Sequence, residues 1–201
     1  MRKTCGTLLI LLGVCLLLCA AVMVGSHFWS QKKAEEYSMA ALGKLEITVS
    51  TEESESSPTV QIPHYQLNPD MGMPEKIVDG VAYIGLLEIP VLNLQLPIIS
   101  STTGAYLQIA PCRFTGSAYL NDLVIGAHNY AAHFGNISSL SYGDLVEFTD
   151  MDGNHFVYQV ADIETLQPDQ AELLCAGDWP LSLYTCNPGG RTRLTVRCDL
   201  A

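Results

Sequence analysis

The sequence predicts an all-β domain, a barrel or a sandwich, that follows one N-terminal membrane-spanning helix. Residues 4–29 carry no charged side chain and are apolar over a length sufficient for a helix to cross ~30 Å of hydrocarbon. From Val81 onward, short runs rich in Val, Ile, Leu, Tyr and Thr alternate with Gly, Pro, Asn or Asp. This spacing is typical of short strands joined by turns.

The charge distribution predicts how the chain sits in the membrane. Arg2 and Lys3 precede the apolar run and all 21 acidic residues follow it, so the positive-inside rule places the N-terminus in the cytoplasm and the remainder outside. Lys32 and Lys33 on the far side oppose this orientation. The formal net charge of -11 argues against a partner that is a nucleic acid.

Two processed forms of the N-terminus are alternatives to an uncleaved anchor over residues 1–30. A cleaved signal peptide has a shorter apolar core and a small-residue cleavage site, which this run lacks. A lipoprotein needs a small residue before its cysteine, whereas bulky Leu18 precedes Cys19. We therefore favour the anchor, in which Cys5, Cys15 and Cys19 act as small hydrophobic residues.

A stalk and a linker are expected over residues 31–79. Gln31–Glu46 has helix-forming composition and is expected to prolong the membrane helix. Thr51–Thr59 is rich in Glu, Ser and Pro without an apolar period, which is typical of a solvated linker. The β-domain then occupies residues 80–201.

Seven segments of this domain have the composition of strands. They are residues 82–89, 92–99, 119–127, 144–150, 155–166, 180–185 and 191–198. Between the fourth and the fifth, Asp152-Gly153 predicts a tight hairpin turn. The oxygens of Asp150, Asp152 and Asn154 also suggest a calcium loop, but such a loop needs a later bidentate Glu where a strand begins instead.

Two short helices are expected between the strands. The first is Thr102–Ala110, which Pro111 ends. The second is a single turn within Asn136–Tyr142. Neither changes the predicted fold class.

Two segments carry the candidate chemistry. DLVIGAHNYAAHFGN (Asp122–Asn136) runs from a strand into a glycine-bearing loop with His128 at the strand's exit, where functional loops lie. In PLSLYTCNPGGRTRLTVRC (Pro180–Cys198), Cys186 ends one strand, a turn follows, and Arg191 opens the next strand.

The two-residue period of the last strand places its arginines on one face. Leu194, Val196 and Cys198 share the core face, so Arg191, Arg193 and Arg197 are expected on the other, beside Cys186. Positive charge beside a thiol lowers its pKa and favours the thiolate.

A cysteine, a histidine and an arginine have complementary roles in acyl transfer. The thiolate attacks a carbonyl, the imidazolium protonates the departing amine, and the guanidinium stabilises the developing oxyanion. Each residue alone is also explained by an inert strand-end thiol, a polar loop or a solvated sheet face, and it is their order and spacing that favour catalysis.

The motifs YIGLLEIPVLNLQLPI, VIGAHN and SLYTC, the last followed by an Arg-hydrophobic strand, resemble those of sortases. These are membrane-anchored cysteine transpeptidases of Gram-positive bacteria, and the resemblance covers nearly all of Val81 to the C-terminus. Here Ser182 replaces the first Thr of the usual Thr-Leu-x-Thr-Cys motif, and Ala127 stands between Gly126 and His128.

The resemblance implies a closed β-barrel of about eight strands with Cys186 as nucleophile and His128 as general acid. Arg193 would position the substrate and stabilise the oxyanion, with Arg191 as its rival. Thr185 would support an oxyanion site. His133 is a second possible acid that we expect to be a polar surface residue.

The implied thiol-protease reaction cleaves a Leu-Pro-x-Thr-Gly-like sorting signal at the C-terminus of a secreted protein. A thioacyl enzyme forms, and an amine of peptidoglycan or a pilin lysine resolves it, with hydrolysis as the side reaction. No cofactor or metal is implied, and the Cys and His spacing lacks a zinc pattern. The subclass stays open, and a pilin-type lid within Asn68–Glu75 is one alternative.

Two other functions stay open. An L,D-transpeptidase also has His before Cys in a β-rich fold, but its Ser-x-Gly-Cys-x-Arg motif does not match the residues around Cys186. A non-catalytic, membrane-anchored binding domain has no chemical need for Cys, His and Arg together. Among the remaining exported cysteines, Cys112 and Cys198 are either bridged or buried thiols, and Cys175 is left over.

Overall fold

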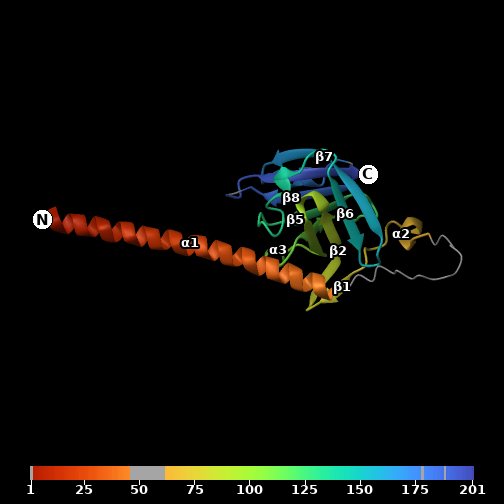
Figure 1. The fold of residues 1–201 in the computed structure, drawn as a ribbon. Helices are drawn as coiled ribbons and strands as arrows, with labels where there is room; N and C mark the ends of the chain where they lie inside the picture. Colours follow the sequence, from red (N-terminus) through yellow and green to blue (C-terminus); the bar gives the residue numbers. More distant parts are fainter. Residues whose placement is uncertain (1, 46–61, 178, 188) are drawn as a thin grey trace.

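The chain folds into a closed β-barrel from which one long helix projects (Figure 1). The structure is a computed structural model that describes residues 2–45, 62–177, 179–187 and 189–201. The strands are β1 Lys76–Val78, β2 Val81–Ile89, β3 Leu94–Ile99, β4 Cys112–Thr115, β5 Leu123–Ala127, β6 Leu145–Asp150, β7 His155–Leu166, β8 Leu181–Cys186 and β9 Arg193–Leu200. The helices are α1 Arg2–Lys44, α2 His64–Leu67, α3 Gly104–Leu107 and α4 Ala171–Leu174, with 3-10 turns η1 Pro90–Leu92 and η2 Ile137–Ser139.

The sheet closes because β2 pairs with β6 as well as with β3. The strand order is β1-β2-β3-β4-β5-β8-β9-β7-β6, and Leu87 of β2 lies opposite both Leu96 of β3 and Phe148 of β6. Strands β2–β9 therefore form an eight-stranded barrel, and β1 extends β2 at one edge. The predicted all-β barrel with a few short helices is confirmed.

The barrel interior follows the two-residue period that the sequence shows. On β8, Leu181 and Leu183 are fully buried, and on β9, Val196 and Cys198 join them in the same core cluster. Every second side chain of these strands points outward. The alternation that buries the core therefore also fixes which side chains lie on the outer face.

The hairpin between β6 and β7 is confirmed. Gly153 has a φ of 84°, the left-handed conformation that such a turn requires. The buried carboxylate of Asp150 accepts hydrogen bonds from the backbone of Asp152 and Asn154, from the Asn154 amide at 2.8 Å and from the Tyr119 hydroxyl at 2.6 Å. These oxygens hold the turn, which supports the structural interpretation over the calcium loop.

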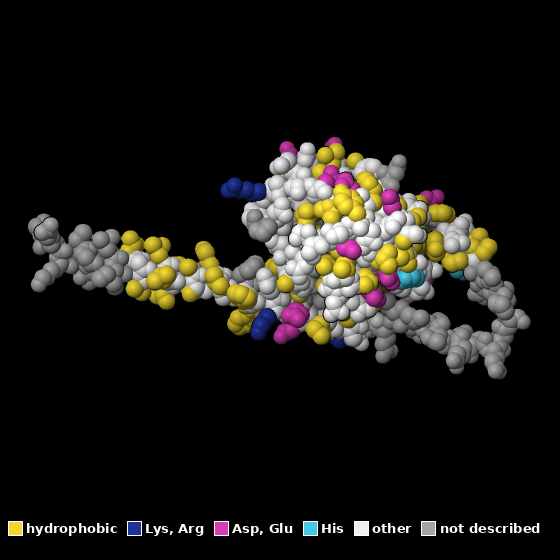
Figure 2. Space-filling model, turned by 45° about the horizontal axis from the view of Figure 1, so that its top comes forward, with side chains coloured by type: hydrophobic (Ala, Val, Ile, Leu, Met, Phe, Trp, Pro, Cys, Tyr) yellow, Lys and Arg dark blue, Asp and Glu magenta, His cyan; other side chains and the backbone are white. Residues whose placement is uncertain are grey.

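Helix α1 has two parts with different surroundings. Residues 12–26 are exposed, and Figure 2 shows apolar side chains on the described part of the projecting helix. Residues Leu12–Lys44 contain a stretch long and apolar enough to cross a membrane. Near the barrel, one face is buried at Ala34, Ser38 and Ala41. The segment that we expected to be a stalk thus packs against the barrel, whereas the predicted linker 51–59 lies outside the described residues.

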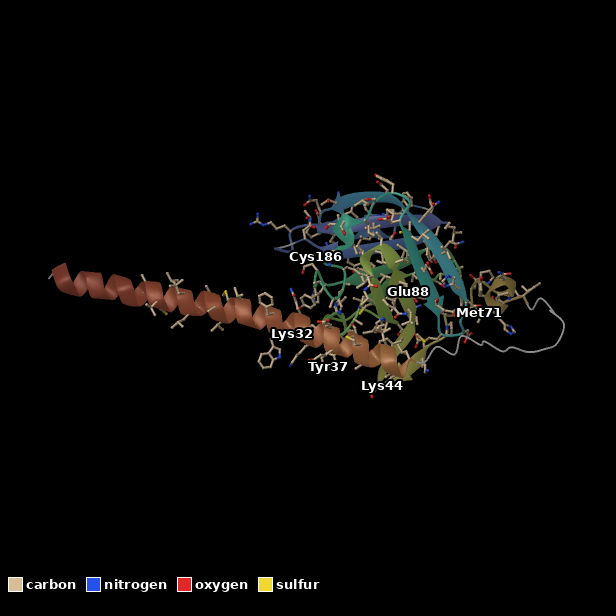
Figure 3. The ribbon with its side chains drawn as sticks, in the orientation of Figure 1. Lys32, Tyr37, Lys44, Met71, Glu88 and Cys186 are labelled. Atoms are coloured by element: carbon tan, nitrogen blue, oxygen red, sulfur yellow. The ribbon has the colours of Figure 1, made fainter. Side chains whose placement is uncertain are left out.

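The segment that carries α2 packs at the end of the barrel away from Cys186. The ring of Tyr65 stacks on Tyr119 with centroids 4.6 Å apart, and Met73 is buried in the barrel core. Figure 3 shows Met71 and Cys186 at opposite ends of the barrel. The alternative of a lid within Asn68–Glu75 is therefore wrong, because this segment is held far from the cysteine.

The four cysteines that follow α1 are free thiols. Cys112 and Cys198 are buried, and burial raises the pKa of each thiol to about 12. The Cys112 thiol donates to the carbonyl of Ala110 at 3.4 Å. Of the two alternatives for this pair, the structure shows buried thiols and no bridge.

Candidate active site

Three neighbouring strands bring the three predicted residues to one place. β5 and β8 are parallel, with Ala127 opposite Thr185, so His128 and Cys186 follow at the same edge of the sheet. On the other side of β8, Arg193 lies directly opposite Cys186. Adjacent strands are ~4.8 Å apart, so the sheet aligns the histidine, the cysteine and the arginine in one row.

Thr185 joins the two parallel strands beneath this row. Its hydroxyl is buried and donates to the carbonyl oxygen of Ala127 at 2.9 Å. The residues bonded in this way immediately precede Cys186 and His128. Thr185 therefore fixes the spacing of the two strand ends rather than facing a substrate itself.

Cys186 lies on the outer face of the barrel. Leu181, Leu183 and Thr185 of β8 are buried and point inward, so Cys186, the next residue after Thr185, points outward and is half-buried there. Figure 3 shows it on the side of the barrel towards which the N-terminal half of α1 extends. The thiol is thus accessible from outside the barrel.

Arg193 presents an unused donor beside the cysteine. Its Nη1 atom is buried and has no hydrogen-bond partner among the described residues. The guanidinium also lies near the Tyr184 hydroxyl: burial raises the pKa of Tyr184 to about 12, and the charge of Arg193 opposes that rise. Arg191 is exposed and precedes β9. Arg193 is therefore the better placed of the two candidates.

The expectation that Arg197 adjoins Cys186 is wrong. Arg197 pairs with Ser182 across the sheet, four positions along β8 from Cys186 and so roughly 13 Å away. It is 2% exposed, and its guanidinium donates to Glu164 at 2.8 Å, to Ser182 Oγ at 2.8 Å and to the carbonyl of Leu174 at 2.8 Å. The guanidinium thus holds α4 against the barrel through its hydrogen bond to the carbonyl of Leu174.

The loop after β5 is held by its own backbone. The carbonyl of Tyr130 accepts from the N–H groups of His133 at 2.9 Å and Gly135 at 2.8 Å, and Phe134 N–H donates to the carbonyl of His128 at 3.2 Å. His128 itself is half-buried, and burial lowers its pKa below the ordinary value. Its imidazole is therefore mainly neutral at pH 7.

His133 is buried, so the expectation of a polar surface residue is wrong. The side chain is 0% exposed, and its Nε2 atom lies 3.5 Å from the Ser38 hydroxyl of α1. Burial lowers the pKa of His133 to about 4, so it is neutral at pH 7. It contacts the helix instead of competing with His128 for the role of acid.

Two aromatic residues near Cys186 were not singled out in the sequence. The Tyr184 ring lies over Gly126, where an added Cβ would come within 2.4 Å of it, and the Phe114 ring meets it edge-on at 5.7 Å. Tyr184 shares the outer face with Cys186, which the two-residue period could have revealed. The glycine of VIGAHN therefore makes room for an aromatic wall beside the site.

The described residues do not gather three His, Cys, Asp or Glu side chains as a metal site would require. The chemistry available in the row of His128, Cys186 and Arg193 is that of a nucleophilic thiol with a neighbouring proton carrier and a forked cationic donor. These features define a class of protein, a β-barrel with a candidate site for cysteine-based chemistry.

Comparison with known proteins names the family within that class. The family model described as the sortase domain matches residues 87–201, more than half of the chain, and the chain therefore belongs to the sortase family. No curated protein matches it.

Solved sortases have a similar fold. Sortase A from Corynebacterium diphtheriae is 24% identical with a TM-score of 0.55, over 60% of this chain and 61% of that one, so this chain spans less than two thirds of it. Sortase C1 of Streptococcus agalactiae is 27% identical with a TM-score of 0.54, over 59% of this chain and 69% of that one. Sortase C of Streptococcus pneumoniae is 26% identical with a TM-score of 0.55, over 63% of this chain and 70% of that one.

Proposed function

We propose that this protein is an active sortase-type cysteine transpeptidase that cleaves a Leu-Pro-x-Thr-Gly-like sorting signal of secreted proteins. The observation that carries the proposal is the alignment of Cys186 with His128 on one neighbouring strand and Arg193 on the other. Membership of the sortase family supports the same chemistry.

In the first half of the reaction, the Cys186 sulfur bonds to the carbonyl carbon of the Thr-Gly bond. His128 accepts the thiol proton, which its mainly neutral imidazole is suited to do. The unpartnered Nη1 of Arg193 offers a donor to the oxyanion that forms. The C–N bond then breaks, and His128 gives its proton to the departing glycine amine.

In the second half, an amine attacks the thioester carbon and the sulfur leaves. The amine's proton passes through His128 to the thiolate, which restores the enzyme. The acceptor is an amine of peptidoglycan or a pilin lysine, and water gives hydrolysis instead. A pilin acceptor draws support from the Streptococcus pneumoniae sortase C, whose structure was described as informing pilin substrate specificity.

We propose that residues 1–30 anchor the protein in the cell membrane and that the catalytic barrel, residues 80–201, is extracytoplasmic. Residues 31–79 join the two. The uncharged run and the placement of acidic residues after it support this orientation. Figure 3 adds that Cys186 lies on the side of the barrel towards which the apolar part of α1 extends. A sorting signal that emerges from the membrane would meet the thiol on that side.

The test uses the full chain in detergent with a pool of Leu-Pro-x-Thr-Gly-like peptides and intact-mass spectrometry. We expect an acyl adduct that an added amine removes. The adduct should be absent from Cys186→Ala and retained by Cys175→Ala, a matched loss of an exposed thiol. If no peptide gives an adduct and Cys186 reacts no faster with a small electrophile than Cys175, the protein is a non-catalytic binding domain.

A second pair of variants assigns the arginine. Arg193→Lys should lower kcat by about 100-fold, because a single ammonium does not replace a forked donor. Arg191→Lys, the matched change at the exposed neighbour, should retain activity. The opposite result would assign the role to Arg191.

A further inference from the structure

A continuous set of contacts links the candidate catalytic histidine to the long helix. The rings of His128 and Tyr130 are 5.0 Å apart, and the rings of Tyr130 and His133 are 5.6 Å apart. His133 Nε2 then lies 3.5 Å from the hydroxyl of Ser38 in α1. Three rings of one loop thus extend from the active site to the helix.

Ser38 binds a second segment of the barrel at the same point. Its hydroxyl donates to the carbonyl oxygen of Ile109 at 3.1 Å, and the side chain is only 3% exposed. Ala34, one turn earlier, is 0% exposed. Small residues at these two positions let the helix backbone approach the loop and the segment after α3 closely.

The helix and the loop also share the wall of a cavity. A cavity of about 700 Å³ lies between Tyr130 on one side and Trp29, Ser30 and Tyr37 of α1 on the other. The loop that carries His128 therefore faces α1 with two of its residues, Tyr130 and His133. The loop is also held by its own backbone hydrogen bonds and by Phe134, which is fully buried in the barrel core.

We propose that α1 is a positioning element of the active site: by docking on His133 through Ser38, it holds the loop that orients the His128 imidazole. This proposal rests on the proposed transpeptidase function. Proton transfer requires the imidazole at hydrogen-bond distance from the thiol and the leaving amine. The membrane helix thus contributes to catalysis as well as to anchoring.

The proposal predicts that undocking α1 changes kcat and leaves KM nearly unchanged. Cys186 and Arg193 lie on the paired strands β8 and β9, and this pairing places them next to each other without any contribution from α1. A helix that no longer docks on the loop should therefore leave peptide binding nearly unchanged and slow the steps that need His128. A displacement of the order of 1 Å in a catalytic group costs up to about 100-fold in rate.

The main test compares one substitution at a buried and an exposed position of α1. Ala34→Leu adds bulk where the helix meets the barrel, and Ala40→Leu adds the same bulk on an exposed face. In the full chain in detergent, we expect Ala34→Leu to lower kcat by about tenfold with KM within twofold, and Ala40→Leu to match the wild type. Equal kcat in all three proteins overturns the proposal.

Hydrogen exchange keeps this test independent of turnover. The amides of His133, Phe134 and Gly135 are bonded within the loop, so peptides covering residues 128–136 should exchange faster in Ala34→Leu than in Ala40→Leu. Unchanged exchange overturns docking even if the enzyme is inactive. If the wild-type protein showed no turnover at all, the proposed function would be rejected instead.

If Ala34→Leu does not fold, Ser38→Ala provides the same test without added bulk. It removes the hydroxyl that contacts His133 and Ile109. We expect faster exchange of residues 128–136 and a kcat about threefold lower at unchanged KM. Wild-type exchange and kcat in Ser38→Ala would refute the positioning role.

Discussion

Acidification should destabilise the barrel through His133, a residue with no part in the proposed chemistry. The side chain is fully buried between its own loop and α1. Its Nδ1 atom has no hydrogen-bond partner among the described residues. A proton added to this imidazole would place a positive charge where the described residues offer it no carboxylate, and where His128, once protonated, would repel it.

The direction and the magnitude of the change in stability with pH follow from the pKa values of His133. The pKa is ~6.5 in the unfolded chain and about 4 in the folded protein. Between these values the unfolded chain binds more protons, so stability is fully present above pH 6.5 and falls as the pH decreases towards 4. Each pH unit costs ~1.4 kcal/mol, which gives a loss of about 3 kcal/mol over the window.

The assay measures the free energy of unfolding of the full chain in detergent by denaturant titration at pH 7, 5.5 and 4. His133→Gln replaces the imidazole with an amide that does not titrate. Between pH 7 and pH 4, its free energy of unfolding should fall by about 3 kcal/mol less than that of the wild type. His155→Gln, at an exposed histidine, still contains His133 and should follow the wild type.

The comparison between the proteins isolates His133 from the carboxyl groups, which titrate in all of them. Parallel stability curves for the wild type and His133→Gln would refute the reasoning. They would mean that water or a rearrangement of α1 solvates the imidazolium in the folded state. Such a result would also weaken the inference that the helix stays docked on this loop.

Two further predictions concern the strands. Gly126→Ala should lower the free energy of unfolding by about 1–3 kcal/mol and displace Tyr184, because the Tyr184 ring occupies the space of the new Cβ. Thermal unfolding should show this loss. Gly104→Ala is the control, because its added Cβ meets nothing within 4 Å. Arg197→Ala should destabilise the barrel by about 3 kcal/mol or more, because it leaves Glu164 and buried acceptors unpaired. Unchanged unfolding midpoints would contradict either account.

Local patterns predicted most of the fold because they report interactions between near neighbours. The β6–β7 hairpin depends on one Asp-Gly pair and on alternation in the flanking strands, and both are visible in the sequence. The row of His128, Cys186 and Arg193 was expected in part for a similar reason: the strand pattern placed His128 and Cys186 at strand ends and Arg193 beside Cys186, and the resemblance to sortases implied that the three act together. Pairing those ends needed only that the strands be neighbours.

The short elements escaped prediction because their stability is not local. β1 and β4 have three and four residues, and each is fixed by pairing with a longer neighbour. The predicted helix over residues 102–110 is also shorter, Gly104–Leu107, with the Thr103 hydroxyl accepting from Tyr106 N–H at its start. The sequence pattern marks the place of such elements but not their length.

His133 and Arg197 show the limit of a face assignment. The period of a strand or the place of a loop says on which side a residue lies, but not whether another segment covers that side. α1 covers His133 and α4 covers Arg197, and each covering contact joins residues distant in sequence, Ser38 with His133 and Leu174 with Arg197. A polar residue expected at the surface thereby becomes a buried anchor for a helix. The same reasoning separates the arginines: Arg197 has its donors satisfied within the protein, whereas Arg193 keeps a buried donor unused beside the thiol.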